Sequence, residues 1–126
     1  SILALANVQH LATDVSGMLA DDASAVALAA SLHPTAAVCG TPTERAAAVI
    51  SELEGMDRGR YAGPVGGVDS RGDGEFGIAL RCGALEDPRT LRLYAGCGIV
   101  AGSTAAGEWA ESEAKLAAMR NAVGAG

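Results

Sequence analysis

The chain is organised around Arg92-Leu93-Tyr94-Ala95-Gly96-Cys97-Gly98-Ile99-Val100-Ala101-Gly102 and the run of residues 103–119 that follows it. This stretch predicts a strand, a glycine turn and a helix. In the predicted helix, Glu108, Glu111 and Lys115 are spaced by three and four residues, the steps that bring side chains onto one helical face. Two carboxylates and one ammonium beside an open glycine backbone predict a site for a metal and an anion.

Length and composition limit the class of protein. The chain has 126 residues, which fits one domain with one core. Hydrophobic residues make up 49 % and charged residues 19 %, so the chain is globular rather than disordered. The net charge is -6 without any basic block, which argues against a nucleic-acid surface. A bound anion would therefore need a local arginine, lysine or metal, because the overall field repels it.

The three cysteines, Cys39, Cys82 and Cys97, are odd in number and lack zinc-site spacing. They predict reduced thiols in a cytoplasmic protein. No run approaches the ~20 apolar residues of a membrane span, so we expect no membrane partner. The sequence begins without methionine or a leader pattern, in what resembles the middle of a strand, and we expect it to be a piece of a longer protein.

The order of apolar runs, caps and turns predicts an α+β domain, with antiparallel β-sheet and packed helices. We expect a buried strand over 2–11, a helix over 23–32, an extended segment over 33–40, and a helix that starts in the Thr41–Glu44 capping box, continues over 46–53 and ends at Gly55. A glycine-rich strand over 63–68, a hairpin turn over 70–74, a strand over 75–85, a turn over 86–89 and a strand over 90–94 complete a meander.

Each charged candidate has a structural and a functional interpretation. Arg81 lies amid apolar residues and needs a partner, either a protein carboxylate or the carboxylate of a ligand, the latter worth ~1.5–3 kcal/mol. Glu111 and Lys115 could form an ordinary surface pair of ~0.3–0.5 kcal/mol, although magnesium needs only one or two carboxylates. Trp109 is expected to anchor the core, and Cys97 is not expected to be a nucleophile.

Six segments in the same order resemble the chorismate-utilising enzymes, which include isochorismate, salicylate and anthranilate synthases. They are Gln9–Thr13, His33–Gly40, Tyr61–Gly66, Ile78–Cys82, Tyr94–Val100 and Glu108–Leu116. The resemblance covers nearly the whole chain and is strongest to isochorismate synthase of the siderophore or menaquinone branch. It implies that residues 1–126 form the C-terminal portion of the chorismate-binding catalytic domain.

The resemblance also implies how the two carboxylates of chorismate are held. Glu111 would be a direct Mg²⁺ ligand, and Glu108 a second carboxylate at that ion, through water. Arg81 and Tyr61 would hold the pyruvyl carboxylate. The backbone at Gly96, Cys97 and Gly98 would add a further contact to the same group.

The same resemblance assigns residues around the substrate ring. Lys115 would lie near the metal-bound carboxylate. His10 would be a supporting catalytic residue near the ring and the pyruvyl group. Ala37, Val38 and Leu80 would form the pocket wall over the ring.

The reaction implied is a Mg²⁺-dependent, reversible isomerisation of chorismate to isochorismate, in which water adds at C2 and the C4 hydroxyl leaves. The family's catalytic lysine base, its glutamic acid and another metal-binding glutamate lie upstream, so the N-terminal half of the enzyme is an expected partner and this chain alone is expected to be inactive. Ala37 stands where salicylate- and anthranilate-forming relatives tend to have threonine, which favours isochorismate as product. Salicylate synthase remains the alternative, and a non-catalytic structural or interaction module is the alternative from another class.

Overall fold

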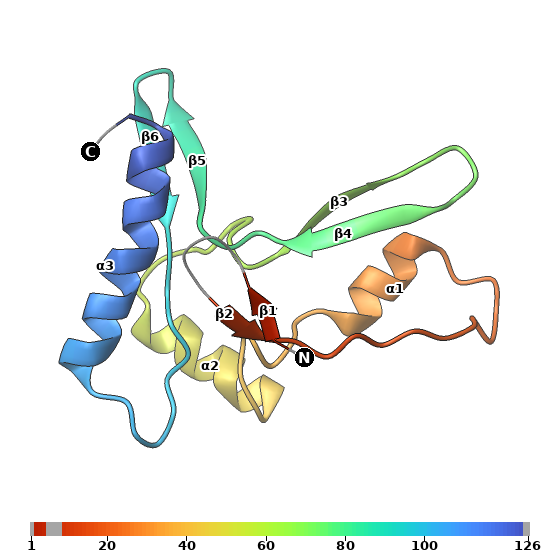
Figure 1. Ribbon diagram of the computed structural model, residues 1–126, viewed down its shortest axis with the longest axis horizontal. Coiled ribbons are helices and arrows are strands. Elements are labelled where there is room, and N and C mark those ends of the chain that lie inside the picture. The colour runs from red at the N-terminus through yellow and green to blue at the C-terminus, as the bar shows by residue number, and fades with distance from the viewer. Residues whose placement is uncertain (1, 5–8, 125–126) are drawn as a thin grey trace.

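A computed structural model describes the backbone of residues 2–4 and 9–124 and the side chains of residues 12–124. The described residues form three helices and three two-stranded antiparallel sheets, which confirms the predicted α+β class (Figure 1). The strands are β1 Ile2–Ala4, β2 Gln9–Leu11, β3 Pro64–Val68, β4 Gly74–Ile78, β5 Cys82–Asp87 and β6 Thr90–Tyr94. The helices are α1 Ala25–Leu32, α2 Thr43–Leu53 and α3 Ala105–Ala122.

The β3–β4 hairpin explains the glycine-rich sequence of β3. Gly66 pairs with Phe76, and a Cβ at Gly66 would lie 2.0 Å from the carbonyl oxygen of Glu75. Only glycine lets the partner backbone approach so closely. The predicted turn is confirmed: the Asp69 carboxylate accepts hydrogen bonds from the backbone N–H groups of Arg71 and Asp73.

The predicted meander is wrong, because the strand expected over 75–85 is broken. Strand β4 ends at Ile78, β5 begins at Cys82, and these two strands do not pair. Between them, Arg81 adopts a φ of 48°, a left-handed conformation that ends an extended strand. The chain therefore forms separate β3–β4 and β5–β6 hairpins, which point in different directions in Figure 1.

Three local predictions also need correction. The strand expected over 2–11 is instead the pair β1 and β2, in which Leu3 faces His10. Residues 36–39 form a turn rather than an extended segment, since the backbone N–H groups of Val38 and Cys39 both bond to the Thr35 carbonyl oxygen. The capping box is absent because Pro42 is extended, with a ψ of 139°, and is itself the N-cap of α2, without a side-chain cap bond.

Other helix ends agree with the sequence. The Ser24 hydroxyl accepts from the backbone N–H of Ala27 at 3.2 Å and caps α1. Gly55 follows α2 with a φ of 61°, the left-handed conformation that favours glycine after a helix. The Thr104 hydroxyl accepts from the N–H of Gly107 and starts α3.

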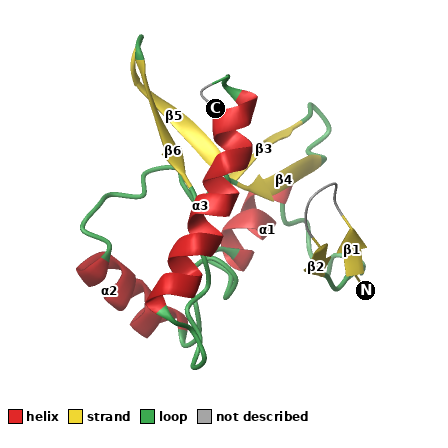
Figure 2. Cartoon of the chain, turned by 60° about the vertical axis from the view of Figure 1, so that its left-hand side comes forward, coloured by secondary structure: helices red, strands yellow, loops and turns green. Residues whose placement is uncertain are grey.

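The described residues do not form the single core that the composition predicts. Ala62, 4 % exposed, is the buried hydrophobic residue among them, and no helix buries a side chain. Trp109 is 70 % exposed, so its predicted role as a core anchor is not met within this chain. Figure 1 shows why: α1 with the β3–β4 hairpin and α3 with the β5–β6 hairpin form separate arms, and in Figure 2 the two hairpins again point away from each other.

The length and hydropathy of the helices decide whether any of them could span a membrane. Within residues 12–124, none of α1, α2 and α3 combines enough length with enough apolar character to cross a bilayer.

Candidate functional site

Segments far apart in sequence meet around a cavity of about 190 Å³. The turn at 36–39, the loop after α2, the loop at 95–98 and α3 all contribute to its lining. Eight residues that the sequence analysis assigned to substrate binding line this cavity: Ala37, Val38, Tyr61, Leu80, Gly96, Cys97, Gly98 and Lys115. The fold therefore gathers most of the predicted substrate-binding residues, although they come from five separate segments, the fifth being the connection between β4 and β5 that contains Leu80.

Lys115 connects α3 to the glycine loop. Its ammonium donates to the carbonyl oxygen of Gly96 at 2.9 Å and to Oε1 of Glu111 at 2.5 Å. The Lys115 side chain is 25 % exposed, whereas that of Glu111 is 54 % exposed. The predicted i,i+4 pair is therefore present, and its cation is directed at the cavity wall rather than into bulk solvent.

Cys97 is the central residue of the glycine loop at residues 96–98, and its neutral thiol contacts α3. Its Sγ donates to the carbonyl oxygen of Glu108 and accepts from the Ser112 hydroxyl, each at 3.5 Å. The bond from Ser112 is the largest influence and lowers the pKa of Cys97, but a hydrogen bond with the Glu108 side chain, burial and the charges of Glu108 and Glu111 together raise it. A raised pKa disfavours the thiolate, as expected for a cysteine that is not a nucleophile.

The two predicted metal ligands lie on α3, outside the lining of the 190 Å³ cavity. A hydrogen bond from Ser103, then one from Cys97 and the charge of Lys115, lower the pKa of Glu108, so its carboxylate is ionised at neutral pH. In the part of the chain that the structure describes, no three His, Cys, Asp or Glu residues are grouped to hold a metal. Two carboxylates still suit Mg²⁺, which takes one or two of them and completes its shell with water and substrate oxygens.

The Tyr61 side chain is half-buried, and two neighbouring side chains contact its ring. It stacks on Tyr94 with centroids 5.2 Å apart, and the Arg58 guanidinium carbon lies 5.6 Å from its centroid. A Cβ at Gly96 would lie 2.9 Å from the Tyr61 hydroxyl, so this hydroxyl reaches the glycine loop. Burial is the main cause of the raised pKa of Tyr61, which keeps the phenol protonated and able to donate.

Two further predicted residues lie elsewhere. Arg81 follows Leu80 directly but does not line the 190 Å³ cavity, and it is half-buried between β4 and β5. His10 lies in β2, and its side chain is outside the described residues.

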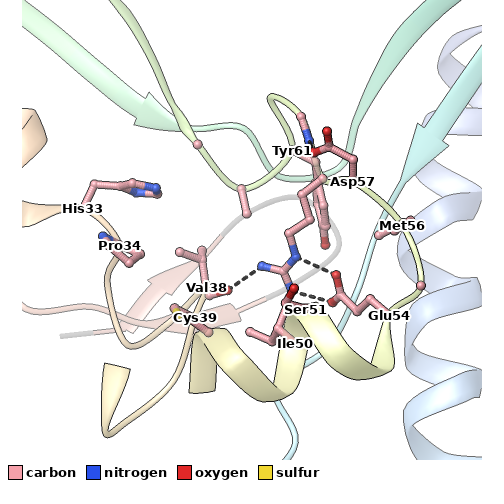
Figure 3. Close-up of a pocket in the computed structure, with 16 residues that line it drawn as sticks. His33, Pro34, Val38, Cys39, Ile50, Ser51, Glu54, Met56, Asp57 and Tyr61 are labelled. Carbon is pink, nitrogen blue, oxygen red and sulfur yellow. Dashed lines mark hydrogen bonds and ion pairs between the residues drawn. The ribbon is translucent and has the colours of Figure 1, made fainter. Parts of the chain in front are cut away.

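Arg58 and Glu54 line the cavity as well, although no motif in the sequence singled them out. The Arg58 guanidinium donates to both carboxylate oxygens of Glu54, at 2.7 and 2.5 Å, and to the carbonyl oxygen of Val38 at 2.9 Å. Figure 3 shows these bonds in an adjoining, larger cavity of about 700 Å³. The i,i+4 spacing of Glu54 and Arg58 across the end of α2 is the signal that could have identified them.

Comparison with known proteins places this arrangement in a family. The profile of the chorismate binding enzymes matches residues 1–124. Isochorismate synthase MenF of Bacillus subtilis is 48 % identical over 94 % of this chain, and isochorismate synthase DhbC of the same organism is 46 % identical over 98 %. Isochorismate synthase EntC of Escherichia coli is 44 % identical over 91 %.

The match covers nearly all of this chain but a minor part of each relative. The chain spans 25 % of the length of MenF, 31 % of DhbC and 29 % of EntC. The family profile nevertheless covers 124 of the 126 residues, a range that includes every residue lining the cavity. The chain belongs to the family of chorismate binding enzymes.

Proposed function

We propose that the protein containing this chain is an isochorismate synthase, which reversibly isomerises chorismate by adding water at C2 and releasing the C4 hydroxyl. The observation that carries the proposal is the gathering of eight expected substrate-binding residues around one cavity. The names of the relatives support the same activity. The product would feed siderophore, salicylate or menaquinone synthesis, and we expect the enzyme to work in the cytoplasm.

The cavity offers donors for a carboxylate. Tyr61 is protonated, so its hydroxyl can donate to the pyruvyl carboxylate, together with the backbone N–H groups of Gly96, Cys97 and Gly98. Arg81, which follows Leu80 outside the cavity lining, is the proposed guanidinium partner of the same carboxylate. Lys115 supplies positive charge at the same wall. Local cations of this kind are required, because a dianionic substrate would be repelled by a chain of net charge -6.

The shape of the cavity suits a site that is shared with another part of the protein. Ala37, Val38 and Leu80 provide an apolar wall for the substrate ring. The volume of about 190 Å³ is below the roughly 300–1,000 Å³ of typical ligand pockets. We propose that the N-terminal part of the same enzyme completes the site, supplies the lysine base and the glutamic acid, and covers the exposed apolar side chains. His10 would support the chemistry from β2.

Mg²⁺ is the proposed cofactor. Glu111 would hold it directly and Glu108 through water; both project from α3, and two carboxylates match the number that Mg²⁺ takes. When bound, the ion would neutralise and orient the ring carboxylate of the substrate. Lys115, already paired with Glu111, would keep that carboxylate in place.

The test is to purify the full-length protein that contains this chain and incubate it with chorismate, with and without Mg²⁺. Chromatography should show isochorismate only when Mg²⁺ is present, and the equilibrium should be reached from either side. The isolated 126-residue chain should be inactive. A full-length protein that leaves chorismate unchanged would exclude the enzyme and favour a structural or interaction module.

Salicylate synthase is the second candidate activity, because it shares the site and additionally eliminates pyruvate. Ala37 distinguishes the two: it lies in the cavity wall, where a threonine would add a hydroxyl next to the ring. We expect the full-length enzyme to release no pyruvate, and Ala37→Thr to release a measurable amount in a coupled pyruvate assay. Pyruvate release by the unmodified enzyme would establish the second candidate instead.

A further inference from the structure

Arg58 links two walls of the cavity that are distant in sequence. Its guanidinium donates to the carbonyl oxygen of Val38, 20 residues earlier, and its carbon lies 5.6 Å from the centroid of Tyr61. Val38 lies in the turn at 36–39, which has no regular secondary structure to hold it. The guanidinium therefore connects a turn and an aromatic side chain that neither helix nor sheet fixes.

The geometry of Arg58 is that of a brace rather than a ligand-binding group. Nε and Nη2 are taken by the Glu54 carboxylate and Nη1 by Val38, so each guanidinium nitrogen already has an acceptor. The Arg58 side chain is 26 % exposed and that of Glu54 is 30 % exposed, so the pair is partly shielded from water. Because the planar guanidinium of Arg58 binds both carboxylate oxygens of Glu54, the pair fixes the orientation of the Arg58 side chain as well as the position of its charge.

We propose that Arg58, oriented by Glu54, is a positioning residue that holds Tyr61 and the turn at 36–39 in the geometry that binds substrate. The inference rests on the proposed function, in which Tyr61 donates to the pyruvyl carboxylate and Val38 lies over the ring. Arg58 itself touches neither carboxylate of the substrate. Its contribution is made through the Tyr61 hydroxyl, which reaches the glycine loop at Gly96.

A positioning role predicts a specific kinetic pattern. Arg58→Lys keeps the charge but loses the fork, so Tyr61 and Val38 are held less firmly. We expect KM for chorismate to rise about tenfold, in line with the 10–100-fold effect of residues that orient a site, while kcat falls by no more than about twofold. Glu54→Gln should change KM in the same direction, since a neutral amide holds the guanidinium less tightly.

The decisive test is a double-mutant cycle in the full-length enzyme with Arg58→Lys and Tyr61→Phe. If Arg58 acts through the Tyr61 hydroxyl, Arg58→Lys should lower kcat/KM about tenfold in the unmodified enzyme but only about two- to threefold in the Tyr61→Phe background. Equal effects in both backgrounds would overturn the proposal. Arg120→Lys is the matched control, because Arg120 pairs with Glu113 on α3 away from the cavity, and it should leave kcat/KM unchanged.

A second readout separates this inference from the proposed reaction. Burial is the largest influence on the pKa of Tyr61 and raises it, whereas the nearby Arg58 charge lowers it. Arg58→Met should therefore shift the Tyr61 titration to higher pH, followed by ultraviolet absorbance as the difference from the same protein carrying Tyr61→Phe. If the enzyme leaves chorismate unchanged but this shift is seen, the proposed reaction is excluded while the contact by which Arg58 positions Tyr61 is supported. An unchanged titration in folded Arg58→Met would overturn the brace itself.

Discussion

The two sides of the cavity are built in different ways. On one side, Tyr61 is stacked on Tyr94, neighbours Arg58 and adjoins Ala62, the buried residue of the described chain. On the other side, Glu108, Glu111 and Lys115 project from α3. This helix buries none of its residues, and its Trp109 is 70 % exposed. The first wall is held by packing of aromatic and charged side chains within this chain, whereas the second is held by its own helical hydrogen bonds and by bonds from α3 to Gly96 and Cys97 of the glycine loop.

The two sides show that the relative positions of side chains and their shielding from water have different structural origins. A helix fixes the relative positions of Glu108, Glu111 and Lys115 without tertiary packing, because its spacing is set by local geometry. The Glu111 carboxylate is nevertheless left near water, with its side chain 54 % exposed, where interactions between charges are weak. The Tyr61 wall already has the shielding that a binding site needs. The α3 side can gain it only when another part of the protein covers the exposed apolar surface.

The largest expected effect tests the α3 side. Glu111→Gln in the full-length enzyme should lower kcat/KM about a thousandfold, because it would remove a charge that we propose binds Mg²⁺, comparable to losing a preorganised electrostatic group. Steady-state kinetics over a range of Mg²⁺ concentrations would measure the loss. Glu113→Gln is the matched control on the same helix, since Glu113 pairs with Arg120, and it should retain full activity. A Glu111→Gln enzyme with nearly normal kcat/KM would exclude this residue as a metal ligand.

The next prediction tests whether the α3 side is covered in the complete protein. Trp109→Ala should destabilise the full-length protein by about 3 kcal/mol, the usual cost of emptying a buried tryptophan site. Urea unfolding, followed by circular dichroism, would measure the difference. A change below about 0.5 kcal/mol would mean that Trp109 stays at the surface, as most exposed substitutions do, and that the two sides differ in the complete protein too.

A smaller effect is expected on the Tyr61 side. Gly96→Ala would place a Cβ 2.9 Å from the Tyr61 hydroxyl, so either the ring or the loop must shift. We expect KM for chorismate to rise about tenfold with the fold retained, because displaced contacts weaken productive binding. Gly102→Ala, where an added Cβ meets nothing within 4 Å, should leave KM unchanged. Equal kinetics for both variants would show that the Tyr61 hydroxyl is not held in place by the loop.

The smallest effect concerns the Glu54–Arg58 pair. The hydrogen bond from Arg58 is the main cause that lowers the pKa of Glu54 from its ordinary value of 4.5. A carboxyl whose pKa is lowered on folding stabilises the protein above that ordinary value, and the contribution disappears as pH falls through the lowered pKa. We expect it to be below about 1 kcal/mol for a partly exposed pair. Urea unfolding of the protein and of Glu54→Gln between about pH 7 and about pH 3 should show the two stabilities converge at low pH; a constant difference would contradict the assignment.

The sequence determined the parts of this chain that depend on local chemistry. The α+β class, the Ser24 cap, the glycine after α2, the hairpin at Gly66 and the spacing along α3 all follow from backbone preferences of a few neighbouring residues. The resemblance in six ordered segments was also sufficient to identify the family. These features need no knowledge of distant contacts.

Only the tertiary structure decided how the segments meet. The left-handed φ at Arg81 divides a predicted strand and separates two hairpins, which the apolar run around it did not indicate. The brace from Arg58 to Val38 joins residues 20 positions apart, and no periodicity encodes such a contact. The exposure of Trp109 likewise depends on what packs against α3 rather than on its own apolar character. Local preferences fix the elements, but burial and long-range hydrogen bonds are properties of their assembly, and the site depends on that assembly.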